Sequence, residues 1–295
     1  MPEGNEIHRW AERHTEAFEG KKMHVEGPNG RFADAALLEG RRLERVLAVG
    51  KHLGYDFGGD RILHVHLGRY GDWTEGQMPM PEVRGILRLR MWRVGARLVK
   101  GAAEPAKRHG WYSSDDGSSK LDPARVDWVE LRGPTDCSVY TRERWETLLK
   151  RLGPDPLNGD GVEAAVERIA KAKKPIGVLL MEQDVMAGIG NIYRAELLFR
   201  ARLSPFAMGV DVPATTLKAI WQDAKPLLKA GMVDRRIVTT LARARPHREL
   251  KPPLKEEVHY VYRRHGKPCW VCGTTVLKKD MAGRNLYWCP TCQAA

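Results

Sequence analysis

The sequence has no apolar run that approaches the roughly 18 uncharged residues needed to cross a bilayer. Its first residues, MPEGNEIHRWAERH, also lack the apolar core of a secretory signal. These two absences argue against membrane and secreted proteins. We therefore expect a cytoplasmic protein that has no membrane partner.

Acidic residues are too few to balance the basic ones, since 37 Asp and Glu face 49 Lys and Arg. The net charge is +12 and the isoelectric point about 9.6. A basic surface can lack any function, but an excess of this size favours a polyanionic partner, because Lys and Arg displace condensed counterions. A small acidic substrate would not need so much diffuse charge.

Cysteine is scarce as well, with five in 295 residues. Four of them lie within residues 269–295, which favours a metal site in a reducing compartment over a disulfide framework. We interpret the fifth, Cys137, as a small buried hydrophobe.

The chain shows strand patterns first and helical patterns later, and no internal repeat. Residues 3–19 have the apolar spacing of one helix face. Short alternating runs predict strands within residues 42–50, 52–57, 61–67, 86–92 and 96–101. Helices are predicted at 141–153, 162–172, 191–201 and 214–230. Separate blocks of strands and helices predict an α+β fold with two domains and a small C-terminal module, and the proline-rich stretch 244–257 is expected to be a linker or mobile loop.

The C-terminal cysteines have the spacing of a zinc site. Cys269 and Cys272 form one CxxC pair, and Cys289 and Cys292 form another after 16 residues. Four thiolates on two tight turns close a tetrahedral site and leave no open position, so one zinc ion per chain would be structural, holding a hairpin too small for its own core. Four unrelated cysteines are the weaker alternative. Lys278, Lys279 and Arg284 lie between the pairs and suit DNA backbone contact, although zinc ribbons also bind proteins.

The N-terminal residues Pro2 and Glu3 allow two interpretations. Proline at the first helical position followed by an acid is ordinary helix-start chemistry. If Met1 is removed, however, Pro2 carries a free secondary amine that can attack C1′ of a nucleotide and form an iminium, while Glu3 moves protons.

A second ambiguous segment is Gly188-Ile-Gly190-Asn191, which opens a predicted helix. Asn191 could simply be the N-cap of that helix. Alternatively, backbone N–H groups and the positive end of the helix could cradle a phosphate. The segment follows a helix and not a strand, so it is not a dinucleotide-binding fingerprint.

Taken together, these residues resemble one family. The Pro2-Glu3-Gly4 start, Gly50-Lys51-His52, the run at residues 66–71, the segment after Gly188 and the terminal GRNxYWCPxCQ resemble the formamidopyrimidine-DNA glycosylase and endonuclease VIII (Fpg/Nei) family. The five motifs occur in order along effectively the whole chain.

The resemblance implies an N-terminal β-sandwich with an N-terminal helix, a helix–two-turn–helix domain and a zinc finger, with boundaries at 1–136, 137–250 and 251–295. It implies a monomeric glycosylase and AP lyase acting on duplex DNA that contains oxidised bases or abasic sites. Pro2 would be the Schiff-base nucleophile and Glu3 the proton donor. The resemblance further implies that Lys51 contacts phosphate and helps catalysis, and that Asn191 and Arg284 grip the phosphates around the flipped nucleotide, Arg284 as part of the catalytic set. Such a protein would be associated with the bacterial nucleoid through its binding to DNA.

Two positions depart from the family pattern. Asn5 follows Pro-Glu-Gly where many members have proline or histidine, and Arg69 stands where the formamidopyrimidine branch has methionine. The run 66–71 is closer to the endonuclease VIII branch, so Arg69 and Tyr70 are candidates to fill the space left by the flipped base, or simply an exposed hairpin end. We expect an oxidised-pyrimidine substrate, with oxidised purines and a non-catalytic DNA-binding protein as the alternatives.

Overall fold

The computed structural model describes residues 2–96 and 121–294. They form two compact units, one built from Pro2 and Ile7–Lys150 and the other from Glu3–Glu6 and residues 151–294. Among the described residues no helix is long and apolar enough to span a membrane. The domain boundaries at 136 and 250 stay a prediction, and the strand expected at 96–101 lies, apart from its first residue, outside the described residues.

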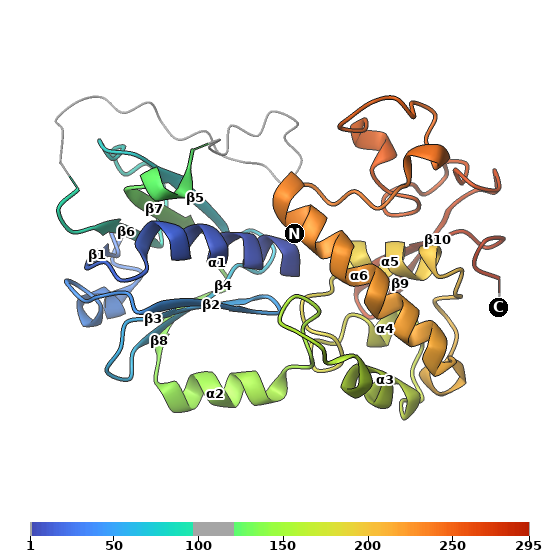
Figure 1. Cartoon of the computed structure of the whole chain (residues 1–295), viewed down its shortest axis with the longest axis horizontal. Coiled ribbons are helices and arrows are strands. Elements are labelled where there is room, and N and C mark those ends of the chain that lie inside the picture. Colours follow the sequence, from blue (N-terminus) through green and yellow to red (C-terminus); the bar gives the residue numbers. More distant parts are fainter. Residues whose placement is uncertain (1, 97–120, 295) are drawn as a thin grey trace. The chain divides into compact units, whose positions relative to one another are not determined.

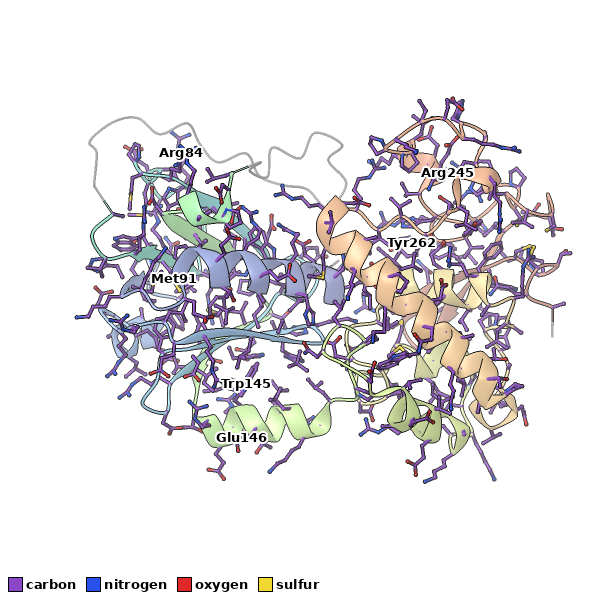
Figure 2. The ribbon with its side chains drawn as sticks, viewed as in Figure 1. Arg84, Met91, Trp145, Glu146, Arg245 and Tyr262 are labelled. Carbon is purple, nitrogen blue, oxygen red and sulfur yellow. The ribbon has the colours of Figure 1, made fainter. Side chains whose placement is uncertain are left out.

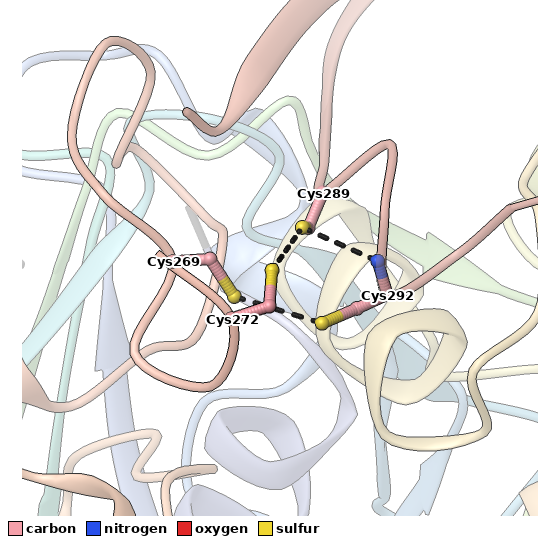
Figure 3. A group of neighbouring side chains, drawn as sticks. All are labelled: Cys269, Cys272, Cys289 and Cys292. Atoms are coloured by element: carbon pink, nitrogen blue, oxygen red, sulfur yellow. Dashed lines mark hydrogen bonds between the residues drawn. The ribbon is translucent and has the colours of Figure 1, made fainter. Parts of the chain in front are cut away.

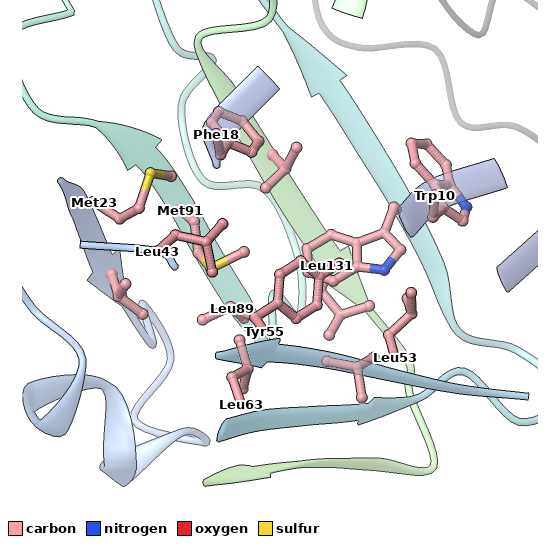
Figure 4. Close-up of a cluster of buried hydrophobic side chains, with 14 of the residues drawn as sticks. Trp10, Phe18, Met23, Leu43, Leu53, Tyr55, Leu63, Leu89, Met91 and Leu131 are labelled. Atoms are coloured by element: carbon pink, nitrogen blue, oxygen red, sulfur yellow. The ribbon is translucent and has the colours of Figure 1, made fainter. Parts of the chain in front are cut away.

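The first unit begins with helix α1, Gly4–Phe18, close to the predicted 3–19. Ile7, Trp10 and Phe18 are buried along one face, as their spacing predicts. They pack against the inner sides of two sheets in one core, part of which Figure 4 shows.

Two four-stranded antiparallel sheets enclose this core. The first has the order β1-β6-β7-β5, with bounds Met23–Glu26, Leu89–Arg93, Trp128–Arg132 and Asp72–Gly76. The second has the order β2-β3-β4-β8, with bounds Arg45–Val49, His52–Asp56, Ile62–His66 and Asp136–Tyr140. The predicted strands correspond to β2, β3, β4 and β6. Cys137 is buried in the core, as expected.

Helix α2, Arg142–Arg151, covers the outer face of the second sheet. Figure 1 shows α1 and α2 on opposite sides of that sheet. Trp145 points inward from α2 whereas Glu146 points away (Figure 2). A Cβ on Gly54 would lie 2.8 Å from the Trp145 ring, so glycine in β3 makes room for the indole.

The second unit is helical, with α3 at Val162–Ala170, α4 at Ile176–Leu179, α5 at Asn191–Arg200 and α6 at Ala214–Asp234. Three of these helices were predicted, and the single turn α4 was not. Helix α5 is the central element, because every residue from Asn191 to Phe199 is buried. Short 3₁₀ turns lie in both units. Those of the first unit are Ala33–Leu37 and Pro123–Arg125, and those of the second are Gly209–Asp211, Ala242–Ala244 and Lys255–Glu257.

The stretch 244–257 is anchored at both ends. The Thr240 hydroxyl donates to the Glu257 carbonyl at 2.6 Å, and the Thr239 amide donates to the Val258 carbonyl at 2.9 Å. Beyond it, strands β9, Leu277–Met281, and β10, Arg284–Trp288, pair as the C-terminal hairpin. Strands and helices thus occupy separate parts of the chain, as an α+β fold requires.

Candidate catalytic and nucleic-acid-binding site

The Glu3 carboxylate is buried at the N-terminus of α5. Its two oxygens accept hydrogen bonds from the backbone amides of Gly190 at 3.0 Å, Ile192 at 2.8 Å and Tyr193 at 3.3 Å. Only 1% of Glu3 is exposed. The amides at a helix start have no partner within the helix, and the helix dipole is positive there, so this arrangement stabilises an ionised carboxylate.

Glycines allow this close approach. The Gly4 amide donates to the Gly188 carbonyl at 2.8 Å, and a Cβ on Gly4 would lie 2.9 Å from the Gly188 Cα. A Cβ on Gly190 would lie 2.5 Å from Cδ of Glu3. The contact between these two motifs, which are far apart in sequence, therefore requires glycine at positions 4 and 190.

Asn191 is not an N-cap. Gly190 occupies that position, and Asn191 is the first residue of α5, so the interpretation of Asn191 as a simple cap is wrong. Its amide Nδ2 donates to the Asn285 carbonyl at 3.0 Å, and its Oδ1 accepts from Arg194. These bonds place Asn191 beside β10, one residue from Arg284.

Arg194 is a functional candidate that the sequence analysis missed. Its guanidinium is fully buried, and burial lowers its pKa to about 10, with the negative charge of Glu3 opposing this effect and the positive charge of Arg284 adding to it. Glu3 and Arg284 are therefore close enough to Arg194 for their charges to act on its guanidinium. The available signal was its position three residues after Asn191, on the same face of the helix.

Arg284 begins β10 directly after the turn residues Ala282 and Gly283, which have φ of 54° and 70°. Its side chain is exposed. The second unit thus brings together Glu3, Asn191 and Arg284, three of the predicted site residues.

The remaining predicted side chains belong to the first unit. Pro2 is buried and precedes α1, which starts at Gly4, so Pro2 is not the first helical residue. Lys51 lies in the turn between β2 and β3. Arg69 and Tyr70 form the turn after β4, where Tyr70 is 73% exposed and the Arg69 guanidinium lies 5.3 Å from its ring. Both turns lie at the same end of the sheet, since His52 pairs with His66.

The four C-terminal cysteines converge on one point, as Figure 3 shows. All four Sγ atoms lie within 4.8 Å of one another. The Cys269–Cys292 and Cys272–Cys289 separations are 3.8 and 3.4 Å. Four thiolates about 2.3 Å from one zinc ion would stand roughly 3.8 Å apart, so the donor set fits tetrahedral zinc.

Three family models match the chain in order. Residues 1–109 match the formamidopyrimidine-DNA glycosylase N-terminal domain, and residues 152–242 match the H2TH domain of the same enzymes. Residues 266–295 match the zinc finger found in FPG and IleRS. Together with the cysteine geometry, this last match shows a structural zinc site.

Full-length relatives are also similar. Endonuclease 8 1 of Mycobacterium tuberculosis is 39% identical over 99% of this chain and 100% of its own length. Formamidopyrimidine-DNA glycosylase of Thermus thermophilus is 30% identical over 99% of this chain and 98% of its own.

Solved structures show the same fold. The MutM (Fpg) protein of Thermus thermophilus aligns with a TM-score of 0.68 and 26% identity, covering 99% of this chain and 98% of that one. The Lactococcus lactis Fpg in complex with abasic-site DNA aligns with a TM-score of 0.71 at 20% identity, covering 99% and 100%. The predicted fold class is confirmed: a sandwich with an N-terminal helix, a helical H2TH domain and a zinc finger.

The zinc site yields a direct test. Purified protein is expected to hold one zinc ion per chain, measured by atomic emission, on the four clustered cysteines. Cys272→Ser should lose the metal and disorder the hairpin, because a site of this kind supplies much of the folding energy of a small module. Cys137→Ala is the control and should keep its zinc, since Cys137 lies in the sandwich core. Protein purified without chelator that holds no metal would contradict the assignment.

Proposed function

The chain belongs to the Fpg/Nei family and is a DNA glycosylase of base excision repair; on that premise, we propose that it is bifunctional, excising oxidised bases through a Pro2 Schiff base and cutting the strand by β,δ-elimination. The observation that carries the proposal is the Glu3 carboxylate held by the first amides of α5, next to Asn191. A carboxylate fixed beside a free amine is the pair that this chemistry needs.

In the proposed reaction, Met1 is absent and the Pro2 nitrogen attacks C1′ of the damaged nucleotide. A C1′–N bond forms, the bond from C1′ to the base breaks, and the base leaves as an anion that takes a proton from water. Opening of the sugar ring gives an iminium, which acidifies C2′ and allows both phosphates to be eliminated. Water then hydrolyses the iminium and releases the enzyme. Because C1′ cannot be reached inside the duplex, the nucleotide must first be flipped out.

Glu3 is proposed to move protons at the sugar. Its three amide donors favour the ionised form, so it first accepts the proton that the Pro2 amine loses on attack. It then donates that proton to the ring oxygen as the sugar opens. Glu3 would thus act as a base and then as an acid.

Contacts to DNA are proposed for five side chains. Asn191 and Arg284, adjacent in the second unit, would bind phosphates around the flipped nucleotide, and Lys51 would bind phosphate from the sandwich. Arg69 and Tyr70 would stack in the vacated space, which their exposure at the turn after β4 permits. The net charge of +12 supports a DNA partner, and we propose that the protein acts as a monomer.

The nucleophile can be identified chemically. Mass spectrometry of native protein is expected to show Pro2 as the first residue. Borohydride added during turnover should reduce the iminium and leave a covalent DNA adduct on Pro2. Pro2→Gly, or a tag that blocks the amine, should greatly weaken trapping. A blocked protein that cleaves lesion DNA at the normal rate would refute the mechanism.

A conservative substitution tests whether Glu3 transfers protons. Glu3→Gln nearly keeps the shape but cannot exchange the proton, so base excision should fall by about 100- to 10,000-fold. Binding to lesion DNA should persist, and a pre-formed abasic site can still be cut because its glycosidic bond is already broken. Single-turnover excision assays beside a binding titration measure both effects. Excision within a few-fold of wild type would remove Glu3 from the role.

We propose oxidised pyrimidines, such as thymine glycol or a hydroxylated cytosine, as the substrates. Three points favour this. The turn at residues 66–71 resembles that of the endonuclease VIII branch, and identity to Endonuclease 8 1 is 39% against 30% for the formamidopyrimidine enzyme. In addition, the stretch 244–257 is Pro- and charge-rich where the purine-cleaving branch has a Gly- and aromatic-containing capping loop. Pyrimidines need less capping and are selected through their weakened stacking.

Side-by-side rates decide the substrate class. Duplexes that each carry thymine glycol, dihydrouracil or oxidised guanine opposite cytosine should be cut fastest at the pyrimidine lesions. Faster release of oxidised guanine would assign the chain to the purine branch and leave the Pro2 chemistry intact. Binding to all three without cleavage would instead indicate a non-catalytic damage-binding protein.

A further inference from the structure

Three histidines gather on the outer face of the second sheet, beside the turn that carries Lys51. His52 opens β3 and faces His66 of β4, which in turn faces Asp136 of β8. Their rings are close, with centroids 4.8 Å apart for His52 and His66 and 5.2 Å apart for His52 and His64. The functional site described above uses none of these imidazoles.

Hydrogen bonds connect Asp136, His64 and His52 in one chain. His64 Nδ1 lies 2.9 Å from Asp136 Oδ2, and His52 Nδ1 lies 2.9 Å from His64 Nε2. Although burial opposes it, hydrogen bonds from Ser138, Tyr140 and His64 hold the pKa of Asp136 below its usual value. Asp136 is therefore an ionised acceptor, and His64 Nδ1 must donate to it.

Because His64 Nδ1 donates to Asp136, the tautomers of both His64 and His52 are fixed. Burial lowers the pKa of His64, so at neutral pH the ring is uncharged and its Nε2 accepts. His52 Nδ1 must then be the donor, which leaves His52 Nε2 as a lone-pair acceptor. Burial, followed by the charges of His66, His64 and Lys51, lowers the pKa of His52 to about 3.

The Lys51 ammonium acts on both neighbouring rings, since its charge lowers the pKa of His52 and also that of His66, after burial. A protonated imidazole at either position would repel it. From α2, the Arg144 guanidinium lies 3.8 Å from the Tyr140 ring and also disfavours the charged form of His64. The negative charge of Asp136, in contrast, favours protonation of the three imidazoles.

We propose that the Asp136–His64–His52 hydrogen-bond chain positions Lys51: it anchors the first residue after the β2–β3 turn, so that the Lys51 side chain is held where it can bind a DNA phosphate. The inference rests on the proposed function, in which Lys51 binds that phosphate. His52, His64 and Asp136 are positioning residues, because they act on the reaction through Lys51.

The first experiment compares two changes at His52. Asparagine places an amide donor where Nδ1 stands and cannot be protonated, so His52→Asn should cleave abasic DNA within about threefold of wild type. His52→Leu removes the donor and should slow single-turnover cleavage by about tenfold to a hundredfold, the scale expected when a catalytic group is misplaced. His24→Leu, at an exposed histidine of the other sheet, is the matched control and should have no effect. Equal rates for His52→Asn and His52→Leu would overturn the proposal.

The second experiment tests the other link of the hydrogen-bond chain. His64→Phe keeps this position aromatic but removes the acceptor of His52 Nδ1, so single-turnover cleavage of abasic DNA should slow as it does in His52→Leu. If the two histidines act as one unit, the double variant should be no slower than either single variant. Single-variant effects that multiply in the double variant would contradict the proposal.

Two further readouts separate this inference from the proposed function. Nitrogen NMR of the histidine rings should show that His52 and His64 are both protonated on Nδ1. A proton on Nε2 of His52 would refute the proposed hydrogen-bond chain, regardless of the cleavage rates. The salt slope of binding to an abasic-analogue duplex should fall by about one unit in His52→Leu if the Lys51 contact is lost. Wild-type protein that is inactive on lesion and abasic DNA would refute the proposed function. The NMR and binding results would still show whether the Asp136–His64–His52 hydrogen-bond chain positions Lys51.

Discussion

The contact between the Glu3 carboxylate and the first amides of α5 is the constraint on which the second unit's site depends. It joins residues 187 to 190 positions apart and takes residues Glu3–Glu6 into the second unit, although the rest of α1 packs in the sandwich core. A buried carboxylate is costly unless its oxygens are satisfied, and here backbone amides that would otherwise lack partners satisfy them. The same bonds orient the start of α5, where Asn191 contacts β10.

Helix α5 takes part in a second contact between a carboxylate and backbone amides, and here the helix supplies the carboxylate. Its own Glu196, fully buried, accepts from three successive amides, those of Tyr260, Val261 and Tyr262, at 2.7 to 2.9 Å. That segment leads into the zinc module. One helix therefore offers amides to a carboxylate at its start and a carboxylate to amides further along, which fixes both the catalytic N-terminus and the chain entering the hairpin. The apolar residues of α5 pack into two hydrophobic clusters, so nearly every residue of the helix is buried.

The sequence predicts those features whose signal is local. The cysteine pairs, the apolar face of α1 and the longer helices depend on neighbours a few residues apart, and the structure contains them. Strand β7 was not predicted, and its Glu130 is a buried acid whose partner Arg90 lies 40 residues away. The N-cap interpretation of Asn191, one of two that the sequence allows, is wrong because Gly190 is the cap, and the Asn191 amide donates to Asn285, which is 94 residues distant. Local rules place a polar residue at a helix start but do not show that a distant strand uses its side chain.

Pairing of acids with the backbone also shapes the charge that the protein presents to DNA. Glu3 and Glu196 each accept hydrogen bonds from backbone amides. Other buried acids do take arginine, as Asp56 does with Arg45 and Arg142. Arg284 and the basic residues of the hairpin are exposed at the surface. Because the dipole and the free amides at the start of α5 stabilise the buried Glu3 carboxylate, the interior can hold this acid while basic side chains remain at the surface for a polyanion.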